Sequence, residues 1–264
     1  MNTINNKILE FQDNGFFIIN NFVKAKYIDD FESSLIKICD EQILSRNILQ
    51  TNHEPLIDLF KIGGEYRKNL YKGLQQIEIL HNITNLIHKF FNNDIFFSFT
   101  KMDVITIDSS LRVDIPGERK YLSPVHQDIY PNYLTNKHIK VVVPLRDISK
   151  QKGTMKIYPG SHKLGYIKPL YKNNKMFPSI ESKHYDKYNG HDLDLNAGSA
   201  IFFNPLLLHS SVPPSNWSKI KFISGFDVQD ISSITDPNDN SNVFSSISGI
   251  NKTRKEKRKK ANGF

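Results

Sequence analysis

The chain is organised around the stretch Ser123-Pro124-Val125-His126-Gln127-Asp128. Successive side chains on an extended strand point to opposite faces, so His126 and Asp128 would share one face while Gln127 points to the other. An imidazole and a carboxylate on one face, completed by a second imidazole from elsewhere, form the 2-His-1-carboxylate set that binds non-haem Fe(II). His126 and Asp128 are therefore candidate metal ligands.

The spacing alone carries little weight, because it occurs twice in a chain with nine histidines and 27 acidic residues. The other pair, His184 and Asp186, lies in a polar, turn-rich segment over residues 183–190 that is typical of a loop. For either pair taken alone, exposed or hydrogen-bonded side chains are the simpler interpretation. The surrounding sequence has to distinguish the two.

Composition predicts a globular protein of a reducing compartment. With 264 residues, 39% of them hydrophobic, the chain can form one large domain. Cys39 is the only cysteine, so no internal disulfide can form. The first residues do not resemble a signal peptide, and no apolar run approaches the roughly 18 residues of a membrane span. We expect a soluble, cytoplasmic protein without a membrane span.

The formal net charge of +8 arises mainly from one segment. Residues 252–260 contain seven basic residues and one acidic residue, so the rest of the chain is close to neutral. Such a run is usually a disordered, solvated end, although it can also bind nucleic acid or anionic lipid through phosphate contacts. We therefore predict a single domain over residues 1–247 and a basic, disordered tail over 248–264.

Apolar residues recur at helical spacing in the first third of the chain and give way to short strand-like runs beyond it. This order predicts a mainly β fold with flanking helices: a double-stranded β-helix, the cupin-like jelly roll, with N-terminal helices packed outside. The segment 164–196 reads as a long insertion that could form a lid. The predicted helices cover 7–12, 24–49 and 66–91, and the predicted strands 16–19, 95–100, 102–107, 140–145, 154–158, 200–203 and 221–228.

A second polar site follows an apolar strand near residue 200. Three leucines lead directly into His209-Ser210-Ser211, which marks a buried strand that opens into a site. The chain then returns as a strand that carries Lys219 and Lys221. A lysine at the mouth of an apolar strand needs an anionic partner, because burial of a bare ammonium group is costly. The carboxylate of a co-substrate would serve.

Together these segments resemble the phytanoyl-CoA hydroxylase-like family of Fe(II)/2-oxoglutarate-dependent dioxygenases. The resemblance spans about residues 10–228, and its ordered motifs are more specific together than any one alone. They are Phe11-Gln12-Asp13-Asn14-Gly15-Phe16 followed by Phe22, the triplet His126-Gln127-Asp128, the block 152–165 with its Pro159-Gly160-Ser161-His162 turn, and the strand from Gly198 to Ser211.

The resemblance implies that His126, Asp128 and His209 bind iron and act in catalysis. It also implies that Ser211 contacts 2-oxoglutarate, that Gln127 follows the motif and could line the cofactor pocket or pack, and that His162 is structural.

One departure concerns the far carboxylate of 2-oxoglutarate, which the family usually binds with an arginine some ten to a dozen residues after the distal histidine. Lys219 and Lys221 flank that position here. Lysine is a point charge without the bidentate fork of arginine, but it can still neutralise a carboxylate. The two lysines share a face of the predicted strand, so both remain candidates, with Lys221 preferred because it lies deeper.

The activity implied by the resemblance is hydroxylation of an aliphatic C–H bond of a small molecule, with dioxygen consumed and succinate and CO2 released. Asp128 favours hydroxylation, because halogenating relatives lack this carboxylate. The alternatives are a non-catalytic metal-binding jelly-roll module and a nucleic-acid-associated protein that acts through residues 252–260. No motif specifies the substrate or an oligomeric state, and the excess of lysine in 46–72 and 164–196 points to an anionic substrate.

Overall fold

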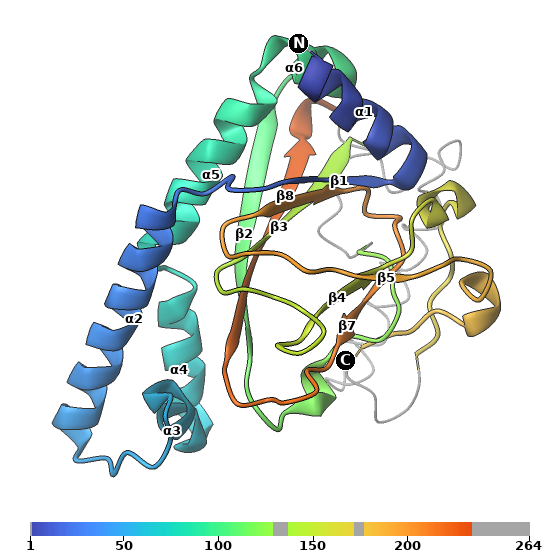
Figure 1. Cartoon of the computed structure of the whole chain (residues 1–264). Coiled ribbons are helices and arrows are strands. Elements are labelled where there is room, and N and C mark those ends of the chain that lie inside the picture. The colour runs from blue at the N-terminus through green and yellow to red at the C-terminus, as the bar shows by residue number, and fades with distance from the viewer. Residues whose placement is uncertain (1, 129–136, 172–176, 234–264) are drawn as a thin grey trace, which may run out of the picture.

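The computed structural model describes residues 2–128, 137–171 and 177–233 of the chain (Figure 1). The segment 248–264, predicted as a basic tail, lies outside the described residues. Among the described helices, none is both long enough and apolar enough to cross a membrane.

Two antiparallel sheets form the body of the molecule. The larger sheet has the strand order β1-β6-β3-β8-β2 and the smaller has the order β5-β4-β7, so neighbours in each sheet are distant in sequence. The two sheets face each other across a small apolar core, which confirms the predicted jelly roll (Figure 1). The strands are β1 (Phe16–Ile19), β2 (Ile105–Asp114), β3 (His138–Pro144), β4 (Thr154–Ile157), β5 (His191–Asp192), β6 (Ala200–Phe203), β7 (His209–Val212) and β8 (Lys221–Asp230).

Helices cover the outer face of the larger sheet, as predicted. In Figure 1, α2 and α5 run along the side of this sheet away from the smaller one, and α1 and α6 close one end. The helices are α1 (Asn2–Asn14), α2 (Ala25–Arg46), α3 (Pro55–Lys61), α4 (Gly64–Leu74), α5 (Glu78–Phe91) and α6 (Asp94–Thr100), with short 3₁₀ turns at Arg119–Tyr121, Ser161–Leu164, Ser182–His184 and Ile231–Ser233.

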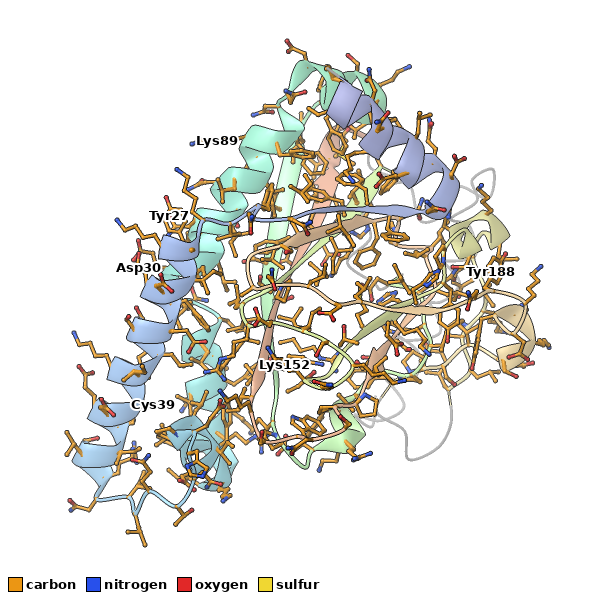
Figure 2. All side chains as sticks on the ribbon, in the orientation of Figure 1. Tyr27, Asp30, Cys39, Lys89, Lys152 and Tyr188 are labelled. Atoms are coloured by element: carbon orange, nitrogen blue, oxygen red, sulfur yellow. The ribbon has the colours of Figure 1, made fainter. Side chains whose placement is uncertain are left out.

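Side-chain alternation on the larger sheet separates an apolar outer face from a mixed inner face. On β3, Val141 and its outer-face neighbours join the main core with the helices, whereas Val142 packs between the sheets. The main core is rich in phenylalanine, and the ring of Phe17 stacks on that of Phe202 at 4.7 Å. Side chains fill the space between α2, which carries the buried Cys39, and the sheet (Figure 2). The outer face of the larger sheet is thus packed against helices, which leaves its inner face to carry polar groups.

Two predicted strands differ from the structure. Residues 95–100 form helix α6, whose N-cap Asn93 accepts a hydrogen bond from the amide of Ile95 (3.2 Å). The cap decides the local structure, because an apolar run this short has no distinctive periodicity. The strand predicted at 102–107 begins at Ile105 and continues to Asp114. The prediction missed residues 108–114 of this strand, because polar side chains on its inner face interrupt the apolar run.

The structure changes the boundaries of two longer predicted segments, the helical region 66–91 and the insertion 164–196. The helical region 66–91 is divided into α4 and α5. The predicted insertion 164–196 ends within the smaller sheet, because β5 pairs with β4 and the amide of Leu193 donates to Met155 (2.9 Å). The part outside the sheets therefore extends only to about residue 190.

Candidate metal centre

Two segments that are distant in sequence are joined backbone to backbone at the site. The amide of His126 donates to the carbonyl oxygen of His209 (2.9 Å), and the amide of His209 donates back to His126 (3.1 Å). The amide of Asp128 donates to the carbonyl oxygen of Pro205 (2.9 Å). His126 thus forms an isolated bridge instead of the predicted strand, and β7 begins at His209.

Hydrogen bonds fix which ring nitrogen of each imidazole faces the site. Nδ1 of His126 lies 2.7 Å from the carbonyl oxygen of Pro124, and Nδ1 of His209 lies 3.0 Å from that of Leu207. Since a carbonyl oxygen can only accept, each neutral ring carries its proton on Nδ1. Both Nε2 atoms therefore present a lone pair to the site.

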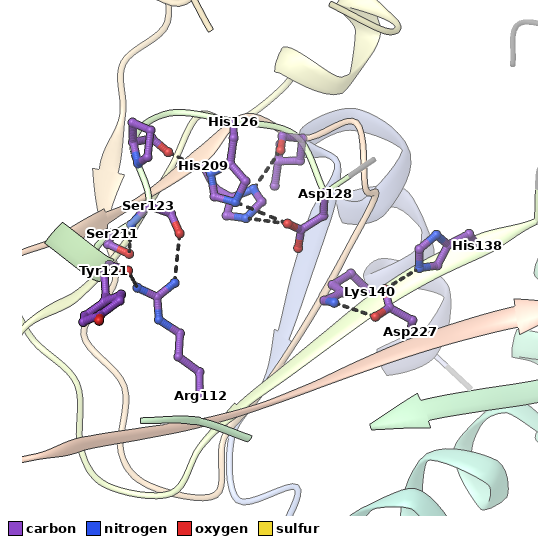
Figure 3. Close-up of polar contacts among 12 residues, drawn as sticks. Arg112, Tyr121, Ser123, His126, Asp128, His138, Lys140, His209, Ser211 and Asp227 are labelled. Atoms are coloured by element: carbon purple, nitrogen blue, oxygen red, sulfur yellow. Dashed lines mark hydrogen bonds and ion pairs between the residues drawn. The ribbon is translucent and has the colours of Figure 1, made fainter. Parts of the chain in front are cut away.

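The three predicted ligands converge on one point (Figure 3). Oδ1 of Asp128 lies 3.3 Å from Nε2 of His126 and 3.6 Å from Nε2 of His209, and the three ligand atoms lie within 4.8 Å of one another. When both rings are neutral, two lone pairs and a carboxylate oxygen face each other, which is unfavourable unless a cation lies there. The donor set is that of 2-His-1-carboxylate Fe(II) sites, so these residues fit such an ion.

The surroundings favour the protonation states that bind metal. Burial lowers the pKa of His126, and the neighbouring His209 lowers it further, so this imidazole is neutral at neutral pH. Burial by itself would raise the pKa of Asp128, but interactions with His209 and Lys140 bring it well below its ordinary value. A neutral imidazole and an ionised carboxylate need to lose no proton before a metal binds.

The triad lines a chamber of about 420 Å³ between the two sheets. Apolar side chains form part of its wall, and the ring of Phe203 stands edge-on to the imidazole of His209 at 5.1 Å. Such a wall lowers the local dielectric and strengthens electrostatic interactions inside. The charged side chains that share the chamber with the triad are Arg112, Asp114, Lys140 and Lys221.

Lys140 lies on the chamber floor close to Asp128 (Figure 3). Its Nζ is 2.7 Å from one oxygen of Asp227, whose other oxygen lies 2.9 Å from Nε2 of His138. Burial alone would lower the pKa of Lys140, but the carboxylates of Asp128 and Asp227 raise it above the ordinary value. The chamber therefore has a fixed cation beside the acidic ligand of the triad.

Lys221, the preferred lysine, lines the same chamber. It is buried, and its Nζ lies 2.8 Å from Oδ2 of the buried Asp114. Lys219 is exposed and lines a different cavity beyond Lys221. Strand β8 begins only at Lys221, so the two lysines do not share a face of one strand. Only Lys221 and Ser211, of the residues expected to bind the co-substrate, line the chamber.

Gln127 does not line the chamber and acts instead as a structural link. Its amide group donates to the carbonyl oxygens of Gly165 (2.8 Å) and Leu206 (2.7 Å) and accepts from the amide of Ile167 (2.9 Å). Both N–H groups of the side chain and one lone pair of its oxygen thus bind main-chain groups of neighbouring segments. His162 is structural as well: its Nε2 lies 3.1 Å from the carbonyl oxygen of Gln12.

Sequence reasoning missed Lys140, Arg112 and Asp114. The alternation of polar residues over 108–114 has the period of a strand with one polar face, and this signal could have been used. The pairing of Lys140 with a residue 87 positions later had no signal in a single sequence. Among the described residues, His184 and Asp186 belong to no such metal-ligating group, in line with the loop interpretation.

A second, larger cavity of about 970 Å³ adjoins the chamber. The two share Ser123, Phe177 and Ser211 in their walls. Most apolar residues that line this outer cavity come from the segment before His126 and from the predicted insertion. Its charged residues are Arg119, Lys120, Glu181 and Lys183.

Comparison with known proteins agrees with the geometry. The model of the phytanoyl-CoA dioxygenase (PhyH) family matches residues 11–218. The peroxisomal phytanoyl-CoA dioxygenase of Homo sapiens is 25% identical over 235 residues, which cover 79% of this chain and 65% of the relative. The Bos taurus protein is 26% identical over 214 residues, covering 76% and 61%. The chain thus spans slightly under two thirds of these relatives.

Solved structures share the fold. The epimerase SnoN, solved in complex with Fe3+, alpha ketoglutarate and nogalamycin RO, superposes with a TM-score of 0.53 at 11% identity, covering 87% of this chain and 84% of SnoN. The non-heme monooxygenase ThoJ superposes with a TM-score of 0.54 at 19% identity, covering 88% and 77%. Since the family match extends over most of the sequence and the fold agrees, the chain belongs to the phytanoyl-CoA dioxygenase (PhyH) family.

Proposed function

We propose that the protein is an oxygenase that uses Fe(II) and 2-oxoglutarate to hydroxylate an aliphatic C–H bond of a small organic substrate. The main support is the convergence of two imidazole nitrogens and one carboxylate oxygen within 4.8 Å. Family membership over residues 11–218 supports the same activity. When bound, metal and co-substrate supply the oxidation, in which dioxygen is consumed, succinate and CO2 are released, and the substrate gains a hydroxyl group.

The chain's own residues hold and shield the reacting groups. His126, Asp128 and His209 would hold the metal from one side, so that the chamber lies on the other. Ser211 and Lys221 line this chamber and are proposed to bind the co-substrate. Burial of the triad limits access of bulk water, which preserves the strength of charge interactions at the site.

The outer cavity is proposed to receive the substrate, because it adjoins the chamber and shares Ser123, Phe177 and Ser211 with it. Among the described residues, three of the four charged side chains that line this cavity are cationic, and Lys183 is paired with Glu181. An excess of positive charge at the mouth attracts anions. We therefore propose an organic anion as the substrate class. The location stays the predicted cytoplasm, although the curated relatives are named as peroxisomal proteins.

Anaerobic addition of Fe(II) and 2-oxoglutarate tests the proposal, because the chelate of the two has a weak visible absorption band. We expect the band in the parent protein and its loss in His126→Ala and Asp128→Ala. The variant His184→Ala, which alters the other His-x-Asp pair, serves as the matched control and should keep the band.

Succinate formation in air then separates an oxygenase from the non-catalytic module. A band without succinate would favour the module, and absence of the band from the parent would overturn the proposal. Salt-sensitive nucleic-acid binding that is lost on truncation at Ile250 would instead support the role of the basic tail.

A further inference from the structure

The buried carboxylate of Asp114 joins two cations of the chamber. Its Oδ2 lies 2.8 Å from Nζ of Lys221, and its Oδ1 accepts a hydrogen bond from Nε of Arg112 (2.7 Å). The side chain of Asp114 is 2% exposed and that of Lys221 is 6% exposed, so water screens this pair very little. Arg112, Asp114 and Lys221 thus form one connected group of three charged side chains in the chamber wall.

Charge balance shows why Lys221 alone is a poor receptor for a second carboxylate. Asp114 already neutralises it one to one at contact distance. Another carboxylate brought to this pair would leave one negative charge in excess in a buried setting, which is costly. Arg112 changes the balance, because the group of Arg112, Lys221 and Asp114 carries one net positive charge and can take one carboxylate to neutrality.

The strand register explains how Arg112 reaches the chamber. Asp114 is opposite Lys221 in the pairing of β2 with β8, and Arg112 is opposite Ile223, one inner-face position further along. The neighbours of Arg112 on β2, Leu111 and Val113, face the helices in the main core. Arg112 therefore lies on the inner face, diagonal to Lys221, and lines the chamber with the triad.

The guanidinium of Arg112 is held in place but not saturated. Nη1 donates to Oγ of Ser123 (3.0 Å), and Nη2 donates to the carbonyl oxygen of Tyr121 (2.9 Å) (Figure 3). Together with the bond from Nε, these use three of its five N–H groups. The side chain is 33% exposed, and two N–H groups remain for a ligand, one on each terminal nitrogen.

The same contacts bring Arg112 beside Ser211. The amide of Ser123, whose hydroxyl contacts Arg112, donates to Oγ of Ser211 (3.2 Å). The fork of Arg112 and the hydroxyl of Ser211 therefore lie on one side of the chamber. A planar fork next to a hydroxyl is suited to a carboxylate, which lysine cannot match in geometry.

We propose that Arg112 binds the far carboxylate of 2-oxoglutarate, with Asp114 holding the guanidinium and Lys221 supplying the positive charge that offsets Asp114. This inference rests on the proposed function. Arginine from β2 thus takes the part that the family gives to an arginine on the returning strand. Asp114 is a positioning residue in this arrangement, since it acts through its two cationic partners.

The test measures co-substrate affinity without turnover. The visible band of the anaerobic Fe(II) chelate is titrated with 2-oxoglutarate and, separately, with pyruvate, which has the same keto acid group but no far carboxylate. Arg112→Met should raise the dissociation constant for 2-oxoglutarate about ten- to a hundredfold, the range of a charge-assisted bidentate contact. Its affinity for pyruvate and for Fe(II) alone should stay within about twofold of the parent.

Two further variants complete the design. Arg112→Lys keeps the charge without the fork and should fall between parent and Arg112→Met for 2-oxoglutarate. Lys219→Ala removes an exposed lysine from the neighbouring cavity and should behave as the parent. If Arg112→Met loses Fe(II) binding through misfolding, Arg112→Lys decides by the same titration.

The outcomes distinguish failure of the Arg112 assignment from failure of the proposed function. A parent protein that gives no band with either keto acid overturns the proposed function. A parent band together with unchanged 2-oxoglutarate affinity in Arg112→Met overturns only the assignment of Arg112. Equal loss of 2-oxoglutarate and pyruvate binding also overturns it, because the effect would then not depend on the far carboxylate.

Discussion

The backbones of His126 and His209 are hydrogen-bonded to each other in both directions, at 2.9 and 3.1 Å. Two ligands from segments more than 80 residues apart are thus fixed by the main chain as well as by their side chains. Residues that support either segment should therefore affect metal binding even where they do not touch the metal.

Ser161 is the first such residue. Its buried hydroxyl accepts a hydrogen bond from the amide of Leu208 (2.9 Å), directly before His209. Ser161→Ala leaves that buried N–H without a partner, so we expect a loss of about 1–3 kcal/mol of unfolding free energy. We also expect weaker Fe(II) binding, measured by titration.

The exposed Ser182→Ala is the control for Ser161→Ala and should change neither quantity. Unchanged metal affinity in Ser161→Ala would contradict the supporting role of the Pro-Gly-Ser-His turn.

The ion pair of Lys140 with Asp227 should be important for stability. Asp227 is opposite Asp108 in the sheet, and cross-strand like charges repel unless a cation compensates them. Lys140→Met removes the ammonium group from the partly buried Asp227, which, among the described residues, keeps only its contact with the imidazole of His138. We expect this change to lower the unfolding free energy in urea by about 2–4 kcal/mol.

A double-mutant cycle with Asp227→Asn gives the coupling between Lys140 and Asp227. It should exceed the coupling of the exposed pair Lys68 and Glu65, which we expect below about 1 kcal/mol. Additive effects of the two single changes at Lys140 and Asp227 would rule out this role for the pair.

Gly198 should tolerate no side chain. Its φ of +80° favours glycine, and an added Cβ would lie 2.8 Å from the backbone carbonyl oxygen of Val23. Gly198→Ala should therefore destabilise by more than the roughly 1–2 kcal/mol of a left-handed backbone alone. The comparison is Gly117→Ala, which has a φ of +86° but no atom within 4 Å of the new Cβ. Equal losses in chemical unfolding would show that the contact with Val23 does not matter.

Asp58 should make stability depend on acid pH. Burial acts to raise its pKa, but hydrogen bonds from Thr51 and Asn52 lower it to about 2. A depressed carboxyl pKa stabilises the fold above the unfolded value near 3.8, and this contribution is lost as pH falls toward 2. We expect the contribution to be about 1–2 kcal/mol.

Unfolding of the parent and of Asp58→Asn over this pH range measures the contribution. The difference in unfolding free energy between the two should shrink as pH falls. A difference independent of pH would show that the ionised carboxylate is not what stabilises the loop at residues 51–52.

Local patterns in the sequence predicted many of the helices and strands. Helical periodicity located α2, α4 and α5, and branched and aromatic runs located β3, β4, β6 and β8. The spacing of His126 and Asp128 marked two of three candidate ligands, and the polar end after Leu206-Leu207-Leu208 marked His209. Each of these features depends on a few neighbouring residues, so a single sequence contains it.

The tertiary structure alone decided which charges meet in the chamber. Lys221 is opposite Asp114 and Lys140 is opposite Asp227 because of strand register, which no local pattern specifies. The sequence favoured Lys221 but kept Lys219 as a candidate on the same face of one strand. Burial separates them, since β8 begins at Lys221 and only Lys221 enters the chamber. Burial and long-range pairing set the energy of a charge, and both are properties of the folded chain.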